Sequence, residues 1–288
     1  MTEILVDAVA DGLLDTLKVI PFLFITYLLM ELLEHHTQEK TLAAIRRADR
    51  LGPLFGGILG VIPQCGFSAS AASFYAGRVI TAGTMIAVFL STSDEMLPLM
   101  LSANVPFGTL VRILATKAVF GIAAGFAVDF LFRRLNQRKI GSSIHDLCAH
   151  DDCSCDEDGI VKSALKHTLN IILFLAITSV LMNIVIGLVG EDALAGLFLN
   201  RPVVGELAAG LIGLIPNCAA SVVITTLYLQ GGMSAGAMMS GLLVGAGVGL
   251  LVLFRNSRRM KENIQITLIL YVCGVLGGLL VGAMRLRF

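Results

Sequence analysis

Two cysteines in closely similar apolar surroundings provide the first groups in this sequence that could bind a ligand. Residues 57–70 read GILGVIPQCGFSAS, and residues 210–223 read GLIGLIPNCAASVV. Each stretch contains Pro, a carboxamide residue and Cys, and Cys65 and Cys218 lie 153 residues apart. Thiolates select soft ions such as Zn²⁺ or Cu⁺, trivalent arsenic is similarly thiophilic, and oxygen ligands suit Mn²⁺. We therefore expect a substrate site at these two motifs.

The neighbours of the two cysteines add polar groups to the expected site. Gln64 and Asn217 precede the thiols, and hydroxyls follow at Ser68, Ser70 and Ser221. The helices that begin after the motifs also offer backbone donors to an anion. Alternatively, Cys and Ser serve here only as small residues that let helices approach closely.

A second group of charged residues occurs once rather than twice. The run STSDE places Asp94 and Glu95 inside an apolar stretch, and Arg112 and Lys117 lie inside the next one. When residues are counted outward from the turn that joins the two stretches, Asp94 and Glu95 lie at depths in the membrane between those of Arg112 and Lys117. Ionisable groups within a span cost at least about 2.5 kcal/mol each unless they are paired or face water. We expect coupling-ion or substrate binding, with a static salt bridge as the alternative. The positions 153 residues further on are uncharged: Gly247, Val248, Gln265 and Leu270.

A third group lies in the polar insert HDLCAHDDCSCDED, residues 145–158. Thiols and imidazoles together favour a soft-metal site on the cytoplasmic side, where thiols stay reduced. A solvated acidic loop with incidental thiols is the alternative, because the spacing matches no standard zinc motif. The candidate ligands are His145, Cys148, His150, Cys153 and Cys155.

Composition places these groups in a membrane. The chain is 56% hydrophobic and 15% charged, with a mean hydropathy of +0.84, whereas soluble proteins are about 25% charged. Several apolar stretches reach the roughly 20 residues that cross a bilayer. No GxxxxGK[ST] loop is present, which argues against ATP-driven transport by this chain. The expected intact spans are Leu14–Leu33, Val79–Leu101, Thr109–Phe132, Leu165–Val189, Met233–Phe254 and Ile264–Val281.

The two motif-bearing segments, residues 51–77 and 203–229, are expected to be broken. Pro63 cannot donate a backbone hydrogen bond, and the helix before it, about 18 Å long, is too short to cross alone. Lys and Arg gather in cytoplasmic loops, so the basic stretches 35–50 and 133–139 should lie on the same side of the membrane. Two intact spans and the broken segment 51–77 lie between them. The number of crossings is even only if segment 51–77 returns to the side on which it began. We predict a helical hairpin in each segment, with a single kinked spanning helix as the alternative.

Each copy then makes an odd number of crossings, so the copies should be inverted in the membrane. Equivalent loops carry opposite charge bias, as inversion requires: basic 35–50 corresponds to acidic 190–200. Inverted repeats with broken helices are a common architecture of secondary transporters. We predict an all-α integral membrane fold of about ten segments, with repeat 1 at 1–135, a cytoplasmic His/Cys-rich linker at 136–162 and repeat 2 at 163–288.

The duplicated IPQCG and IPNCA breaks, the STSDE span and the His/Cys-rich insert resemble the ten-transmembrane heavy-metal exporter family. That family is related to arsenic-efflux permeases, and some of its members are labelled manganese transporters. The resemblance covers nearly the whole chain. It implies efflux of a metal ion or metalloid, and it favours as ligands Gln64, Cys65, Asn217, Cys218, Asp94 and Glu95.

The sequence thus predicts a proton-coupled secondary transporter that exports a heavy-metal ion or metalloid, arsenite-like or divalent such as manganese. An oxyanion transporter for phosphate or arsenate, using Arg112 or Lys117, is one alternative, and a membrane-embedded enzyme or channel is another. We expect a multi-pass protein of the cell membrane with no cofactor. Its expected partners are lipids and the transported ion, without nucleic acid, and a homo-oligomer is compatible with the pattern.

Overall fold

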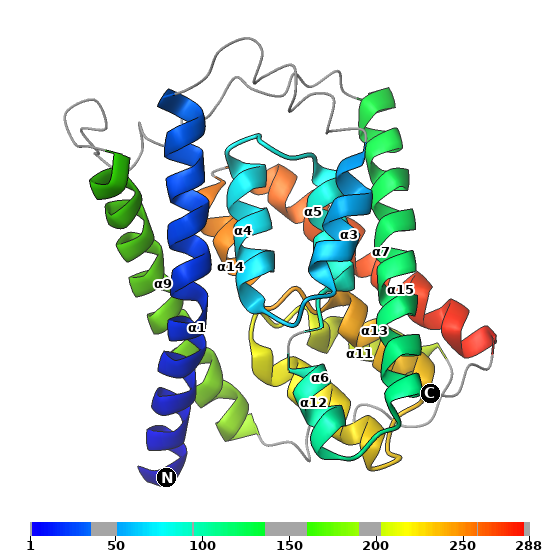
Figure 1. Ribbon diagram of the computed structural model, residues 1–288. Helices are drawn as coiled ribbons and strands as arrows, with labels where there is room; N and C mark the ends of the chain where they lie inside the picture. Colours follow the sequence, from blue (N-terminus) through cyan, green and yellow to red (C-terminus); the bar gives the residue numbers. More distant parts are fainter. Residues whose placement is uncertain are drawn as a thin grey trace.

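The computed structural model describes residues 2–35, 51–93, 95–135, 160–189, 203–257 and 259–284 (Figure 1). Their regular structure is α-helical. The helices are α1 (Thr2–His35), α3 (Gly52–Gly60), α4 (Cys65–Ala76), α5 (Ala82–Ser91), α6 (Met96–Ser102), α7 (Phe107–Leu135), α9 (Ile160–Val189), α11 (Val204–Gly213), α12 (Cys218–Leu229), α13 (Ala235–Val244), α14 (Val248–Asn256) and α15 (Met260–Ala283).

Six stretches are long and apolar enough to cross a membrane, and they confirm the six spans expected from the sequence. The stretches are Gly12–Leu29, Ala82–Ser102, Phe107–Phe132, Ala164–Leu181, Ala235–Asn256 and Met260–Ala283. The helices of the two broken segments, α3, α4, α11 and α12, are too short to cross alone.

Two of the six spans are not continuous helices, and here the expectation of intact spans was wrong. The α5–α6 span is interrupted after Ser91, where Thr92 has an extended ψ of 136°. The α13–α14 span is interrupted after Val244, where Gly247 adopts a φ of +52° that L side chains rarely tolerate. Hydropathy cannot reveal these interruptions because the residues on both sides of them are apolar.

Both motif-bearing segments are interrupted at the proline, as expected. The turn 61–64 joins α3 to α4, and Figure 1 shows these two helices side by side above it. Gln64 is extended, with φ −155° and ψ 117°, and its counterpart Asn217 has φ −147° and ψ 149°. The two breaks therefore share one backbone geometry.

Equivalent helices pack in the same way in the two halves. The helix α5 lies against α7, and α13 lies against α15. A Cβ at Gly125 would lie 2.6 Å from the carbonyl oxygen of Gly83, and a Cβ at Gly278 would lie 2.6 Å from that of Gly236. Only glycine permits these close approaches, which are typical of membrane helix pairs.

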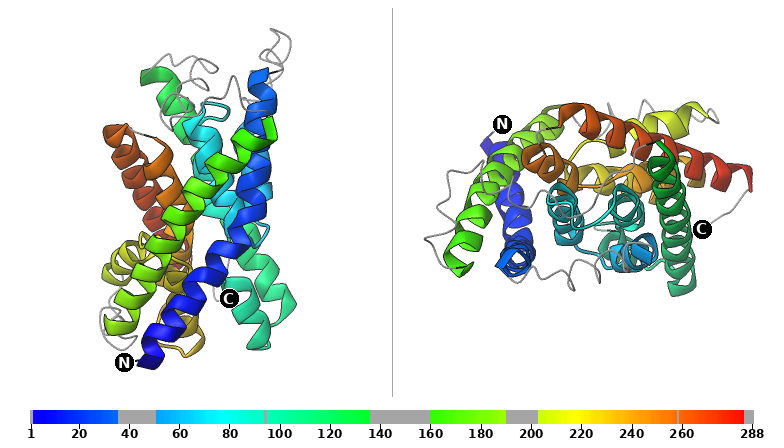
Figure 2. Two further views of the ribbon diagram at one scale, coloured as in Figure 1. Left: turned by 90° about the vertical axis from the view of Figure 1, so that its left-hand side faces the viewer. Right: turned by 90° about the horizontal axis from the view of Figure 1, so that it is seen from above.

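The helices α5 and α13 form the centre of the molecule. Their side chains Met85, Phe89, Met239 and Leu243 are completely buried. Seen from above, α1 and α9 lie at one end and α7 with α15 at the other (Figure 2).

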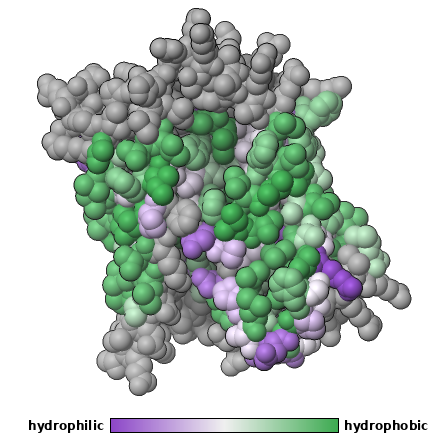
Figure 3. Space-filling model, viewed as in Figure 1, coloured by the Kyte–Doolittle hydropathy of each residue, from purple (hydrophilic) through white to green (hydrophobic). Residues whose placement is uncertain are grey.

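The outward faces of the flanking helices carry large apolar side chains. Val119, Leu173 and Ile177, for example, are more than 60% exposed. Apolar residues cover most of the coloured part of the face in Figure 3, and hydrophilic residues gather in its centre and lower half. Such a surface suits a lipid environment.

Candidate substrate site

The two hairpin tips meet at the centre of the fold and bring the two predicted thiols together. Cys65 is the first residue of α4, and Cys218 is the first residue of α12. Their sulfur atoms lie 3.3 Å apart, and both residues are about 5% exposed or less. The pair comes from positions 153 residues apart, so each copy of the motif contributes one thiol to the same cluster.

The polar neighbours of the thiols fix the first turn of each helix. Ser68 Oγ donates to the Cys65 carbonyl oxygen at 2.8 Å, and Ser221 Oγ donates to that of Cys218 at 2.8 Å. Asn217 is buried, and its Oδ1 accepts a hydrogen bond from the Ala219 N–H at 3.4 Å, so that it caps α12. Gln64 occupies the same position before α4 without a side-chain cap. These residues hold the thiols in place.

A carboxylate completes the cluster. A carboxylate oxygen of Glu95 and the sulfur atoms of Cys65 and Cys218 all lie within 4.8 Å of one another. Glu95 lies in the break between α5 and α6, not inside a regular helix as expected. Asp94 lies outside the described residues. Two sulfurs and one carboxylate oxygen form a donor set for a soft ion.

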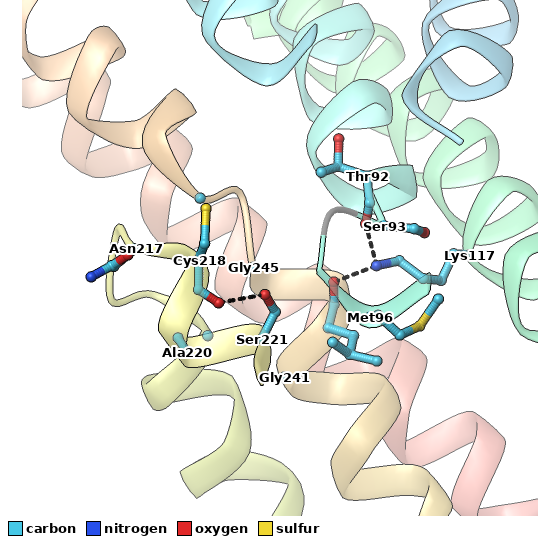
Figure 4. A pocket seen from close by; sticks show the side chains of 13 residues that line it. Thr92, Ser93, Met96, Lys117, Asn217, Cys218, Ala220, Ser221, Gly241 and Gly245 are labelled. Carbon is cyan, nitrogen blue, oxygen red and sulfur yellow. Dashed lines mark hydrogen bonds between the residues drawn. The ribbon is translucent and has the colours of Figure 1, made fainter. Parts of the chain in front are cut away.

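The two predicted bases have different environments. Lys117 is 1% exposed. Its ammonium donates to the carbonyl oxygen of Thr92 and, at 2.7 Å, to that of Leu242 (Figure 4). Arg112, one and a half turns earlier on α7, is exposed. The structure therefore brings Lys117 to the centre and leaves Arg112 on the surface.

A small cavity adjoins the thiol pair. Figure 4 shows it between the first turn of α12, the break after α13 and the break after α5. Cys218 is among the lining residues, whereas Cys65 is not. The lining consists of Thr92, Ser93, Met96, Lys117, Gly213, Asn217, Cys218, Ala220, Ser221, Gly241, Leu242, Gly245 and Gly247.

Helix ends give the centre a polarity that matches these groups. The N-terminal ends of α4 and α12 carry partial positive charge beside the thiols. The C-terminal ends of α5 and α13 carry partial negative charge beside the Lys117 ammonium. The Lys117 ammonium therefore lies at helix ends that stabilise a cation.

Sequence reasoning missed two buried carboxylates, one beside the start of α5 and one in the first turn of α11. Asp129 accepts hydrogen bonds from Thr81 Oγ1 and from the Gly83 N–H, each at 2.8 Å, at the start of α5. Glu206 is 5% exposed, and its Oε2 accepts from the Val203 N–H at 2.7 Å. An acidic residue within an apolar stretch was the available signal in both cases.

The His/Cys-rich insert, residues 145–158, lies outside the residues that the structure describes. Its candidate ligands His145, Cys148, His150, Cys153 and Cys155 all lie outside the described residues. The metal site expected there remains a prediction.

Comparison with known proteins identifies the family. Residues 1–188 match ArsP_2, a family described as "Putative, 10TM heavy-metal exporter". The match covers well over half of the chain, so the chain belongs to this family, which confirms the resemblance predicted from the sequence. No curated protein and no solved structure matches the chain. Family and apolar helices together make this a multi-pass membrane protein, and the family description implies a transporter rather than an enzyme.

Proposed function

We propose that this member of the heavy-metal exporter family is a secondary transporter whose substrate is a thiophilic ion held between Cys65 and Cys218. The observation that carries the proposal is the 3.3 Å separation of the two sulfur atoms. The Glu95 carboxylate lies close enough to both sulfurs to share one ion with them. Soft donors of this kind match heavy metals and metalloids better than they match Mn²⁺.

The number of donors in the cluster also matches the three ligands that trivalent arsenic takes. Cys65 and Cys218 would supply two thiolates, and Glu95 or water could supply the third ligand. We therefore propose an arsenite-like substrate.

An oxyanion substrate receives less support. It would need a cation directed at the site, and the Lys117 ammonium donates instead to the carbonyl oxygens of Thr92 and Leu242. Arg112 is exposed on the surface of α7.

Energy for export must come from an ion gradient if the chain acts alone, since the sequence has no nucleotide-binding loop. We propose the proton as the coupling ion. We further propose that the chain comprises repeats 1–135 and 163–288, inverted in the membrane and joined by the linker 136–162. The shared packing of α5 on α7 and of α13 on α15 supports the repetition.

Transport by the purified protein in proteoliposomes tests the substrate. Arsenite, Zn²⁺, Mn²⁺ and phosphate are compared with and without a proton gradient. We expect gradient-dependent arsenite transport that falls by at least about 10–100-fold in Cys65→Ser and in Cys218→Ser, since even outer-shell metal partners contribute that much. Cys273→Ser is the matched control, because Cys273 lies on α15 outside the cluster. Mn²⁺ transport that survives Cys→Ser but not Asp94→Asn or Glu95→Gln would exclude the soft-ion proposal.

Accessibility of single cysteines tests the inverted arrangement. A single cysteine introduced within 102–107 or within 190–200 should react with a thiol reagent added outside the cell. A single cysteine introduced within 37–50 should not. Reaction of all three cysteines from the same side would disprove inversion.

A further inference from the structure

We propose that the Lys117 ammonium is a tethered cation that occupies a cation site built from the broken ends of α5 and α13. This inference does not depend on the proposed substrate. It concerns a position next to the thiol cluster, and it assigns Lys117 a positioning role in holding the two breaks together.

The first observation is the depth of the charge. Lys117 is 1% exposed, although its long side chain would allow it to reach water from many positions. A lysine at the centre of a membrane helix costs about 2.5–3.5 kcal/mol on insertion scales. A buried ammonium therefore needs strong acceptors, and the structure supplies them.

The second observation is the kind of acceptor. Thr92 is the C-cap residue that follows α5, and Leu242 lies in the last turn of α13. The last four carbonyl groups of a helix have no intrahelical partner. Both carbonyl oxygens therefore need external donors at the breaks, and one ammonium, which has three N–H groups, serves both.

The third observation is electrostatic. The C-terminal end of a helix carries about half a negative charge, and two such ends converge on a single ammonium. In secondary transporters with discontinuous helices, unwound carbonyls and helix C-terminal ends coordinate the coupling cation. Here two acceptors of the same kind bind a cation that belongs to the chain.

The fourth observation is that the buried lysine occurs in only one of the two similar halves of the chain. The residue 153 positions after Lys117 is Leu270, which is fully buried and uncharged. One lysine on α7 therefore bridges a carbonyl from each half of the molecule.

The site also adjoins a small cavity. Lys117, Thr92 and Leu242 all line the cavity beside Cys218 (Figure 4). A shortened side chain at position 117 would leave a space that a small cation entering the cavity could fill. The wild-type protein, by contrast, should need no small cation from solution.

Thermal unfolding of the purified protein without substrate tests the inference. Wild type and Lys117→Ala are compared in ammonium, methylammonium, sodium, potassium and choline chloride at equal ionic strength. We expect the Tm of wild type to be the same in all five salts. The Tm of Lys117→Ala should be lower in choline and rise by several degrees in at least one small cation. Arg112→Ala, on the same helix but exposed, should behave as wild type.

The Lys117→Met variant distinguishes the loss of a bound cation from the loss of side-chain packing. Methionine fills the channel of the lysine stem without a charge, so its lower Tm should not recover in any of the salts. A wild-type Tm that depends on sodium or potassium overturns the inference, and so does equal behaviour of the Ala and Met variants. If Lys117→Ala folds in no salt, including ammonium chloride throughout purification, the inference is also overturned. Because no substrate is present, none of these outcomes depends on the transported ion.

Discussion

The two hairpins present their cysteines to the same centre, but their second helices lie in different surroundings. The helix α4 packs against α14 and α1, whereas α12 has a smaller contact with α6. Ser68 on α4 is fully buried, and a Cβ on Gly249 of α14 would lie 2.9 Å from its Cβ. The corresponding pair in the other half, Ser221 and Met96, lines the cavity.

Polar contacts also hold α4 more firmly than α12. Asn256, at the end of α14, donates its amide to Tyr27 Oη at 2.8 Å and to Ser73 Oγ at 3.1 Å. Thr26 on α1 also donates to Ser70 on α4 at 2.7 Å. The residue that corresponds to Asn256 in the other half is Ala103, which is exposed. The α4 side is therefore closed by side chains, whereas the cavity lies on the α12 side.

The largest expected effect comes from adding bulk to the closed side. In Gly249→Leu, the new Cβ would lie within 3.0 Å of Ser68 and of Phe89, so α14 must move away from α4. Overpacking costs typically 1–3 kcal/mol, and we expect a loss at the upper end of this range in thermal unfolding. Gly108→Leu is the control, since no atom lies within 4 Å of its Cβ. Equal losses in both variants would show that the α4–α14 contact is not tightly packed.

A smaller loss is expected when the polar contacts of the closed side are removed. Asn256→Ala takes the amide donor from Tyr27 and Ser73 and should cost about 1–2 kcal/mol in the free energy of unfolding. Ala103→Asn, the corresponding change on the open side, should stay within about 0.5 kcal/mol because the position is exposed. Denaturation of the two variants side by side measures both losses in the free energy of unfolding. A larger loss in Ala103→Asn than in Asn256→Ala would contradict the assignment of the closed side.

The two thiols should differ in reactivity, although their chemistry is the same. With all other cysteines replaced by Ser, a protein that retains only Cys218 should react several-fold faster with a small thiol reagent than one that retains only Cys65. Cys218 lines the cavity and Cys65 does not. Mass spectrometry over a time course gives both rates. Equal rates would mean that the cavity is not the path to the site.

The smallest effect is expected at the two serines beside the thiols. Each donates to the carbonyl oxygen three residues earlier at 2.8 Å. Ser68→Ala should cost about 1 kcal/mol, because the site is dry, and Ser221→Ala should cost less, because water in the cavity can replace the donor. Unfolding of both variants measures the difference, and a greater cost at Ser221 would contradict the assignment of the open side.

Much of the candidate site follows from the sequence alone. The motifs around Cys65 and Cys218 share Pro, carboxamide and Cys at a fixed offset. Proline removes a backbone donor, and together with the flanking glycines it favours the breaks at Pro63 and Pro216, whereas Pro21 alone leaves α1 continuous. The six long spans follow from hydropathy in the same way.

Only the tertiary structure could decide the breaks after α5 and α13, the partners of Lys117 and the side of the cavity. An apolar span interrupted by a few residues has the same hydropathy as a continuous one. The carbonyl groups of Thr92 and Leu242 become acceptors only because their helices end there, and Lys117 reaches them from a third helix. The two copies carry similar motifs, but Gly249 in one and Met96 in the other set how closely the neighbouring helices can approach. Which side closes depends on packing between residues far apart in the chain, and no local pattern encodes it.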